Sequence, residues 1–443
     1  MNNIYIKRLI DRELLLWSKE ANRKPVLIRG ARQVGKSSSV RKLAEHFDNY
    51  LEINFEQNKK VHKIFDSDLI PKQICENLSI HFNKPIIPGK TLLFFDEIQA
   101  CGNAISSLRF FYEDYPELHV IAAGSLLEFA LEQLPSFGVG RISSMFMYTF
   151  SFSEFILACG EKMLWNKICQ SSPENPLHPV FHEKALEILK QFLVIGGMPA
   201  VVATFVENRN ILECQKILND LINSLRSDFV KYKQRVPELR ISAAFEAVVS
   251  QSGGKFNFAK VEHYTSKQIK ESIELLQKAE LVIPVVHSAA SGIPLGSQEN
   301  PKKQKLLLLD TGIFQRLLGL QLSDVILSND FSMVNKGCIA EQMVGLELLK
   351  ASSCYEQKQL YYWHREATNS HAEVDYLIQQ GEKIIPIEVK SGKSGAMQSL
   401  HLFMKEKQSD YGVRTSLENF AQYDKIKVFP IYAIGNLKQY IND

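Results

Sequence analysis

Hydrophobic and polar positions change their period along the chain, and each period predicts a different element. Residues 25–29 and 91–95 are continuous apolar runs, which are typical of buried strands. Between them, residues 38–47 space Val40, Leu43 and Phe47 as one face of a helix. Strands that alternate with helices favour an α/β fold in this first part of the chain.

Helical spacing dominates the middle of the chain. It extends from Ser151 to about Arg240 and is interrupted at residues 195–202, where "IGGMPAVV" predicts a tight turn between helices. Beyond it, residues 244–286 predict a winged helix-turn-helix. Thr265 and Gln268 form a capping box before an apolar helical stripe, and residues 281–286 form the expected wing strand.

Near the C-terminus, "AEVDYLIQQGEKIIPIEVKSGKS" (residues 372–394) alternates as a β-hairpin. Gly381-Glu382 suits a two-residue type II′ turn, and this turn pairs Gln380 with Lys383 and Asp375 with Glu388. One face is then apolar and predicts a core. The other face sets two carboxylates opposite each other, which is destabilising unless a cation such as Mg²⁺ lies between them.

Composition narrows the class of protein without changing these elements. The chain has 443 residues, 45% of them hydrophobic and 23% charged, as expected of a soluble protein with two to four domains. No apolar run is long enough to span a membrane, and the first 20 residues are too charged for a signal peptide, so an amphipathic helix is expected there. Seven cysteines without a CxxC spacing favour reduced thiols and a cytoplasmic location.

The first candidate for chemistry is a phosphate-binding loop. Gly30, Gly35, Lys36 and Ser37 fit G-x-x-x-x-G-K-[ST] between a predicted strand and a predicted helix. Lys36 is expected to reach the β- and γ-phosphates of ATP, and Ser37 to coordinate Mg²⁺. The backbone of the whole loop is expected to surround the nucleotide, which adds the intervening and following positions Ala31, Arg32, Gln33, Val34 and Ser38.

A second strand supplies the acids that hydrolysis requires. Asp96 and Glu97 end the apolar run at 91–95, where Asp96 would hold Mg²⁺ and Glu97 would polarise the attacking water. A further strand ends at Ser125, which permits two interpretations. Ser125 could sense the γ-phosphate, and it could cap the next helix through a Ser-x-x-Glu pattern; the two roles are compatible.

Five segments in one order, "RGARQVGKSS", "LLFFDEIQ", "AAGSLLEF", "GVGR" and "YTFSFSEF", resemble a family of bacterial and archaeal AAA+-type ATPases with a C-terminal domain of unknown function. The resemblance extends over nearly the whole chain. It implies that Arg141 faces phosphate, either in its own subunit or from a neighbour in a homo-oligomer; the alternative is a surface arginine that closes a loop. We expect an ATPase domain at residues 1–150, a helical lid at 151–240, a winged-helix module at 241–328 and a further domain at 329–443.

The C-terminal hairpin resembles the core of PD-(D/E)xK nucleases. Asp375, Glu388 and Lys390 occupy the positions of that motif, and the resemblance implies a helical acid upstream, Glu341. Glu341, Asp375 and Glu388 would then be ligands of Mg²⁺, with Lys390 beside the attacking water. His364 is expected to be an ordinary polar residue at a strand end.

These predictions leave three functions open. The leading one is ATP hydrolysis coupled to the handling of DNA, with or without metal-dependent cleavage. The alternatives are an ATP-regulated switch whose C-terminal domain binds nucleic acid without cleaving it, and an ATPase that contacts proteins and no nucleic acid. A net charge of +3 is nearly neutral, so any DNA-binding surface must be a local patch. Lysines at 255, 260, 267, 270 and 278 suggest such a patch on the winged helix, although Glu262, Glu271 and Glu274 dilute it.

Overall fold

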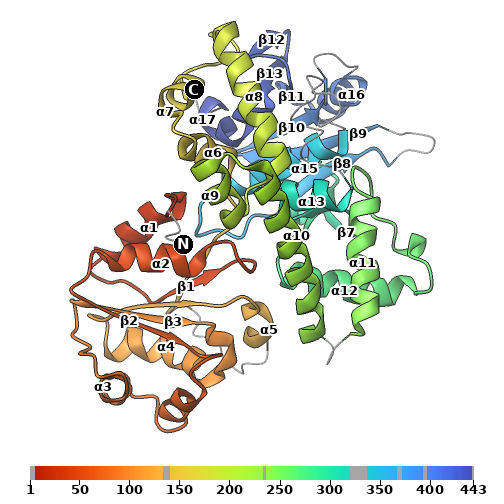
Figure 1. The fold of residues 1–443 in the computed structure, drawn as a ribbon. Coiled ribbons are helices and arrows are strands. Elements are labelled where there is room, and N and C mark those ends of the chain that lie inside the picture. The colour runs from red at the N-terminus through yellow and green to blue at the C-terminus, as the bar shows by residue number, and fades with distance from the viewer. Residues whose placement is uncertain are drawn as a thin grey trace. The chain divides into compact units, whose positions relative to one another are not determined.

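The chain folds into two compact units in the computed structural model (Figure 1). The structure describes residues 5–132, 140–232, 236–319, 337–366, 372–392 and 397–441. Unit 1 comprises residues 1–149 with 278–280 and 353–357, and unit 2 comprises 150–277, 281–352 and 358–443. The domain boundary expected at 328–329 lies outside the described residues.

Unit 1 is built on a five-stranded sheet in the order β2-β3-β4-β1-β5, and every pairing in it is parallel. This confirms the expected α/β class. Its strands are β1 (Val26–Arg29), β2 (Asn49–Asn54), β3 (Thr91–Asp96), β4 (His119–Ala123) and β5 (Ser143–Phe146). Helices lie on both sides of the sheet in Figure 1: α1 (Leu9–Ser18), α2 (Lys36–Ala44), α3 (Pro71–Phe82), α4 (Gly102–Asp114) and the short α5 (Leu127–Leu131).

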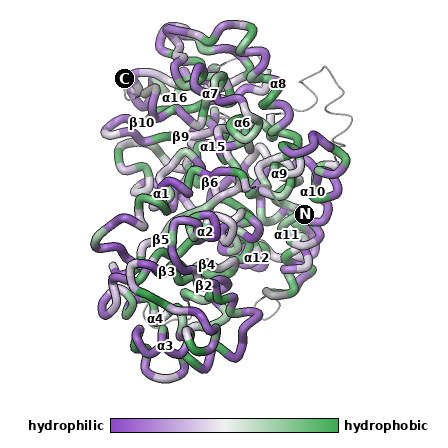
Figure 2. The backbone as a smooth tube through the Cα atoms, turned by 60° about the vertical axis from the view of Figure 1, so that its left-hand side comes forward, coloured by the Kyte–Doolittle hydropathy of each residue, from purple (hydrophilic) through white to green (hydrophobic). Residues whose placement is uncertain are grey.

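Parallel strands covered on both faces explain the continuous apolar runs of the sequence. All six residues of β3 are buried, as are all five of β4. One face packs on α3 and α4 through an aromatic group in which the Phe55, Phe65 and Phe95 rings meet edge to face. In Figure 2 the hydrophilic stretches concentrate on outer turns. Because the strands are buried along their whole length, a ligand can reach unit 1 only at the ends of the strands. The candidate functional residues of unit 1 lie there.

Unit 2 begins with the helical segment that the sequence predicts. Its first helices are α6 (Phe152–Ala158), α7 (Lys162–Cys169), α8 (Pro179–Ile195), α9 (Pro199–Asn208) and α10 (Ile211–Asp228). Two helices, α11 (Glu238–Ser250) and α12 (Ser266–Lys278), follow where the sequence predicts a helix-turn-helix. The predicted capping box is present, because Gln268 N–H donates to Thr265 Oγ1 over 3.3 Å. Further α-helices among the described residues are α13 (Thr311–Leu317), α15 (Gly337–Lys350), α16 (Gln398–Lys407) and α17 (Leu437–Ile441).

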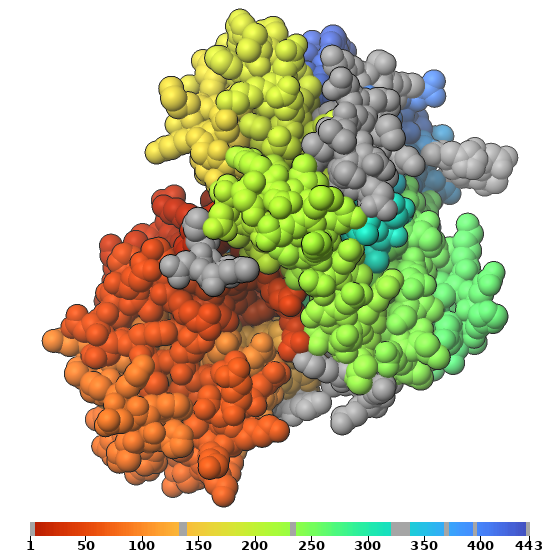
Figure 3. Space-filling model, viewed as in Figure 1, coloured from red at the N-terminus to blue at the C-terminus, as the bar shows by residue number. Residues whose placement is uncertain are grey.

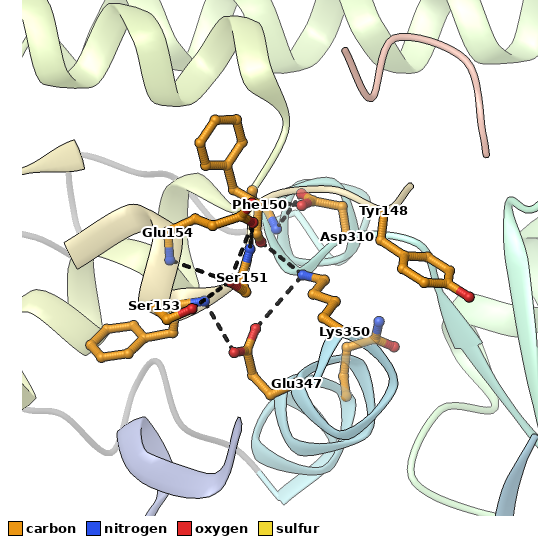
Figure 4. Close-up of polar contacts among 12 residues, drawn as sticks. Tyr148, Phe150, Ser151, Ser153, Glu154, Asp310, Glu347 and Lys350 are labelled. Carbon is orange, nitrogen blue, oxygen red and sulfur yellow. Dashed lines mark hydrogen bonds and ion pairs between the residues drawn. The ribbon is translucent and has the colours of Figure 1, made fainter. Parts of the chain in front are cut away.

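The Gly-Gly turn between α8 and α9 is a packing junction (Figure 4). Gly196 has φ +74°, and a Cβ there would lie 2.1 Å from Asp310 Oδ1. Gly197 N–H donates to Asp310 Oδ2 over 2.6 Å, and its carbonyl accepts from the Phe150 amide over 2.7 Å. A buried carboxylate and two backbone segments thus meet where only glycine fits, which explains the motif without chemistry.

A buried ion pair supports the same junction from α15. Lys350 Nζ donates to the Phe150 carbonyl over 2.8 Å and lies 3.7 Å from the Glu347 carboxylate (Figure 4). Glu347 in turn accepts a hydrogen bond of 3.1 Å from the Phe152 amide. Burial raises the pKa of Glu347 to about 7, against the opposing effect of Lys350. α15 is therefore fixed to the start of the helical segment by polar contacts inside the core.

An eight-stranded sheet in the order β12-β13-β11-β10-β9-β8-β6-β7 completes unit 2. Its strands are β6 (Val282–Ser288), β7 (Glu299–Leu308), β8 (Leu360–His364), β9 (Glu373–Gln380), β10 (Lys383–Val389), β11 (Gly412–Ser416), β12 (Ala421–Tyr423) and β13 (Ile426–Pro430). The expected wing strand is therefore β6, which pairs with both β7 and β8. The hairpin after α12 belongs to the large sheet and is not a separate wing.

The predicted register of the β9–β10 hairpin is confirmed from its turn to the pair of Tyr376 with Ile387, and the predicted pair of Asp375 with Glu388 lies one position beyond it. Gln380 pairs with Lys383 and Ile378 with Ile385, and Gly381 has the positive φ, +56°, that the turn requires. The prediction that only one face of the hairpin is apolar is wrong, however. Successive residues of β9 point to opposite faces of the sheet, and both faces are packed against helices. Tyr376 donates to the Glu341 carbonyl of α15, while Leu377 packs with Phe403 of α16. Helices cover this sheet on both faces, so strict alternation of apolar and polar residues is lost.

Two expectations from composition can be compared with the described residues. No helix there has both the length and the apolar character that crossing a membrane demands. All seven cysteines are described, and no disulfide joins them.

Candidate functional site

The phosphate loop joins β1 to α2 in the conformation that the motif requires. Gly30 and Gly35 have φ values of +151° and +101°, and a Cβ at Gly30 would lie 2.2 Å from the Met147 carbonyl. Gln33 also has a positive φ, +63°, and its side chain is exposed. Ala31 and Val34 are buried under the loop, whereas Ser38 is exposed on the first turn of α2. The loop backbone thus wraps around the N-terminus of α2, where amide groups attract anions.

Lys36 lies inside this loop. Its Nζ donates to the carbonyls of Gly30 over 2.6 Å and Ala31 over 2.8 Å, and only 8% of the residue is exposed. Burial lowers the pKa of Lys36 to about 8, although the nearby carboxylates of Glu280, Glu97 and Asp96 act in the opposite direction. A phosphate at the loop would meet an ammonium that is already partly desolvated.

The loop and the acidic strand meet through Ser37 and Asp96. Ser37 Oγ donates to Asp96 Oδ1 over 3.1 Å, as expected of two oxygens that would share one Mg²⁺. Asn54 Nδ2 donates to the other carboxylate oxygen over 3.3 Å, because Asn54 is aligned with Asp96 where the parallel β2 and β3 end. Burial and the neighbouring Glu97 raise the pKa of Asp96. Asn54 is a site residue that sequence reasoning missed; a polar residue at the end of a strand is its only signal.

Glu97 is held by polar groups from two neighbouring segments. Its Oε2 accepts from Gln99 Nε2 over 2.7 Å and from Ser125 through both the amide, 3.3 Å, and Oγ, 3.1 Å. Arg32 of the phosphate loop donates to Ser125 Oγ over 3.0 Å. Glu97 itself has φ +49°, which turns its side chain out of the strand direction. Ser125 therefore connects the predicted base to the phosphate loop.

The capping role that the sequence suggests for Ser125 is not observed. α5 begins at Leu127 with Leu126 as its N-cap, and no side chain caps it. Glu128, the expected partner in the capping pattern, forms an ion pair with Arg29 instead. Ser125 is thus not a helix cap, because its hydroxyl already bonds to Glu97.

The residues just before α1 contact the phosphate loop and α2. Arg8 donates to the Val34 carbonyl over 2.8 Å and to the Tyr148 carbonyl over 2.7 Å. Tyr5 donates to Asp11 Oδ1 over 2.6 Å, and its oxygen lies 3.0 Å from Ser39 Oγ of α2. Sequence reasoning missed these residues because nothing near them in the chain marks a contact with the loop.

Arg141 does not lie at the phosphate loop of its own chain. Ser143 pairs with Val26, so the segment before β5 lies at the amino end of β1, whereas the loop follows the carboxyl end of β1 at Arg29. Arg141 instead forms an ion pair with Glu113, near the C-terminus of α4. The prediction of a phosphate contact within the same subunit is wrong. The segment with Arg141 lies at the amino ends of the parallel strands, and the phosphate loop lies at their carboxyl ends.

The second group of predicted residues surrounds a lysine that sequence reasoning missed. Lys305 of β7 has its Nζ 2.7 Å from Glu341, 2.5 Å from Glu373 and 3.4 Å from Asp375. Its side chain is only 2% exposed. Although burial opposes the charge, these carboxylates raise the pKa of Lys305 well above its usual value. The cation that the opposed carboxylates require is thus supplied by the chain itself.

The other members of the predicted motif lie beside this cluster. Asp375 accepts from the Val389 amide over 2.8 Å, and Lys390 Nζ donates to Glu388 Oε1 over 2.7 Å. Burial, then the proximity of Asp375, raises the pKa of Glu388 to about 7. Burial likewise raises the pKa of Glu341 to about 7, with Lys305 acting against it. All four predicted residues are in one neighbourhood, as a strand pair and a helix at the same face would place them.

The two predicted Mg²⁺ sites differ in how well their residues fit the ion. At the phosphate loop, Ser37 and Asp96 offer adjacent oxygens with no ammonium between them, so the donor set fits. In unit 2, Lys305 occupies the space among three carboxylates, and the donor set does not fit Mg²⁺ as arranged. A metal there would have to replace a buried ammonium.

A parallel sheet with a glycine-rich loop, a buried lysine and a strand-end Asp-Glu pair defines a P-loop nucleotide-binding protein. Residues 22–156 match the family model of an AAA domain, so this part of the chain is similar to the AAA domains of ATPases. Residues 186–324 and 336–434 match two domains of unknown function, DUF8612 and DUF4143. No curated protein matches the chain.

Proposed function

We propose that unit 1 binds ATP with Mg²⁺ at the phosphate loop and hydrolyses it. The hydrogen bond between Ser37 and Asp96 carries this proposal, because it joins the loop to the acidic strand at the place where a phosphate-bound cation would be shared. Lys36 would neutralise the β- and γ-phosphates. Mg²⁺ would supply the remaining positive charge.

Glu97 is the proposed base that orients the attacking water. In the present arrangement, Gln99 and Ser125 occupy its Oε2. A γ-phosphate that attracts Arg32 and Ser125 would remove hydrogen bonds from Glu97 and leave its carboxylate able to accept from water. Ser125 would thus make the base available only when ATP is complete.

Arg141 is proposed to contribute to ATP hydrolysis from a neighbouring subunit. Arg141 lies at the amino ends of the strands, whereas the phosphate loop lies at their carboxyl ends. From this position Arg141 can reach only a phosphate that is bound by a second copy of the chain. The proposal implies a homo-oligomer of the ATPase.

For unit 2 we propose binding of DNA without cleavage. The ammonium of Lys305 already satisfies the carboxylates that cleavage would require for Mg²⁺. Lysines on and before α12 offer a local positive surface; α11 and α12 are exposed in the space-filling view of Figure 3. Exposed lysines in this region are Lys255, Lys260, Lys267 and Lys270.

The test compares ATP turnover with and without duplex DNA, together with Mg²⁺-dependent cleavage of the same DNA. We expect DNA to change ATP turnover and the DNA to stay intact. A Lys267→Gln/Lys270→Gln variant should lose the response to DNA but keep its basal turnover. Cleavage that disappears in Lys390→Ala would contradict the non-cleaving function.

A second candidate is an ATPase whose unit 2 contacts only proteins. Ion pairs on the same helices favour it, because Glu274 lies 3.8 Å from Lys270 and Glu271 lies 3.1 Å from Arg240. These contacts reduce the positive charge available to phosphate. If neither ATP turnover nor electrophoretic mobility responds to any DNA or RNA, this candidate replaces the first.

A further inference from the structure

Two histidines from different strands meet on one face of the large sheet. His287 on β6 pairs with Tyr362 on the parallel strand β8, and His364 lies two residues further along β8. The two imidazole rings meet edge to face with centroids 4.5 Å apart. Glu366 follows β8, and one ligand atom from each of His287, His364 and Glu366 lies within 4.8 Å of the others. Sequence alone separates His287 from the other two by more than seventy positions.

The imidazole of His287 has the hydrogen bonding typical of a metal ligand. His287 is 2% exposed, and its Nε2 lies 3.3 Å from the His364 carbonyl, which directs the lone pair to Nδ1. Among the described residues, neither His287 Nδ1 nor His364 Nδ1 has a hydrogen-bond partner. A buried nitrogen without a partner is costly, and a metal ion would satisfy both at once.

The charge state of the cluster is also suitable. Burial lowers the pKa of His287, and burial together with Lys255 lowers the pKa of His364 to about 4. Both shifts favour the neutral imidazole, which is the form that binds metals. Only Glu366 brings negative charge to the three ligands.

We propose that His287, His364 and Glu366 bind a transition-metal ion of the Zn²⁺ class. Two imidazoles and a carboxylate are typical zinc ligands, and three protein ligands leave one position for water. The ligand atoms of a tetrahedral zinc lie about 3.3 Å apart, so side-chain movements of about 1 Å would close the site. None of the three ligands belongs to the predicted nuclease motif, although His364 pairs with Glu373 of the β9–β10 hairpin.

Lys303 is the competitor for this site. Its Nζ pairs with Glu366 over 2.5 Å, and the lysine side chain is 38% exposed, so it can turn to solvent when a metal takes the carboxylate. Lys255 adds a second positive charge near His364. Removing Lys303 should therefore strengthen metal binding, a result that an ordinary surface histidine would not give.

The test is titration of the full chain with Zn²⁺ alone, and with Co²⁺ for its visible spectrum. We expect one Zn²⁺ per chain at this site and a tetrahedral Co²⁺ band without a sulfur charge-transfer band. His364→Ala and Glu366→Gln should each weaken binding by at least about tenfold, and Lys303→Gln should strengthen it. His401→Ala, an exposed histidine of α16, is the matched control and should change nothing.

Three results would overturn the proposal. They are the absence of metal uptake, equal affinity in the His364→Ala and Glu366→Gln variants, and a Co²⁺ spectrum that shows thiolate ligands only. His287→Asn is measured as well, with circular dichroism to confirm the fold, since this buried residue could affect folding. The partly exposed ligands His364 and Glu366 keep the test valid if that variant fails to fold.

Discussion

The ammonium of Lys305 on β7 lies 2.7 Å from the carboxylate of Glu341 on α15, and both side chains are almost completely buried. Two more carboxylates share the same ammonium. The sequence places two carboxylates opposite each other in the β9–β10 hairpin and suggests a bound metal between them. In the structure, the ammonium of Lys305 neutralises the charge of Asp375 instead. It also ties the edge strand of the sheet to the helix that supplies the upstream acid.

Replacing Lys305 with Met should destabilise the protein strongly. Removal of one partner leaves buried carboxylates without a cation, which typically costs about 3–5 kcal/mol. The measurement is the free energy of unfolding in denaturant. Lys383→Met is the control, since Lys383 forms an exposed pair with Asp410 and should matter little. An unchanged unfolding free energy in Lys305→Met would show that the cluster is not held by this lysine.

The same variant should gain sensitivity to Mg²⁺. Without the ammonium, Glu341, Glu373 and Asp375 present oxygens that a divalent ion can share. We expect Mg²⁺ to raise the melting temperature of Lys305→Met more than that of the unmodified chain, measured without nucleotide. Equal shifts in the two proteins would mean that the carboxylates do not take up the ion.

Lys36→Ala should reduce ATP turnover by about a hundredfold or more, since a buried positive charge at the transferred phosphate is lost. The measurement is phosphate release at saturating ATP. Lys42→Ala is a matched control on the same helix, where Lys42 forms an exposed ion pair with Glu45. Normal turnover in Lys36→Ala would exclude the phosphate loop as the catalytic site.

ATP affinity should fall as the pH rises through about 8. Burial lowers the pKa of Lys36 to about 8, so the free protein loses the ammonium above that pH, and the charged form is the one that binds phosphate. Dissociation constants measured on both sides of pH 8 test this. A Lys36→Arg variant stays charged throughout, so its affinity should not show this pH dependence. A flat profile for the unmodified protein would contradict the prediction.

Glu347→Gln should remove part of the pH dependence of stability. Burial raises the pKa of Glu347 from 4.5 to about 7, so the folded state binds the proton more tightly than the unfolded state. The resulting stability is fully present below pH 4.5 and is lost as the pH rises through about 7, by up to ~3 kcal/mol. Denaturation of both proteins across this range measures it, with the exposed Glu187→Gln as control. Parallel curves for the chain and Glu347→Gln would contradict the assignment.

Local patterns were sufficient for much of the site. The phosphate loop lies within one turn of the chain, so its glycines, Lys36 and Ser37 could be placed from spacing alone. The register of the β9–β10 hairpin follows from the Gly381 turn, which is also local. The place of Arg141 depends on which strand β5 pairs with and in which direction, and no pattern within its own segment gives either, so the predicted contact with phosphate in the same subunit is wrong.

The sequence by itself determined the elements, the phosphate loop with Asp96 and Glu97, and the hairpin that carries Asp375 and Glu388. Each of these depends on neighbours along the chain, through backbone preference, side-chain period or turn geometry. Only the tertiary structure decided that Lys305 neutralises the carboxylates, that Asn54 contacts Asp96 and Arg8 the phosphate loop, and that His287 meets His364. Those contacts join residues far apart in the chain, and no local pattern records which strands become neighbours in a sheet.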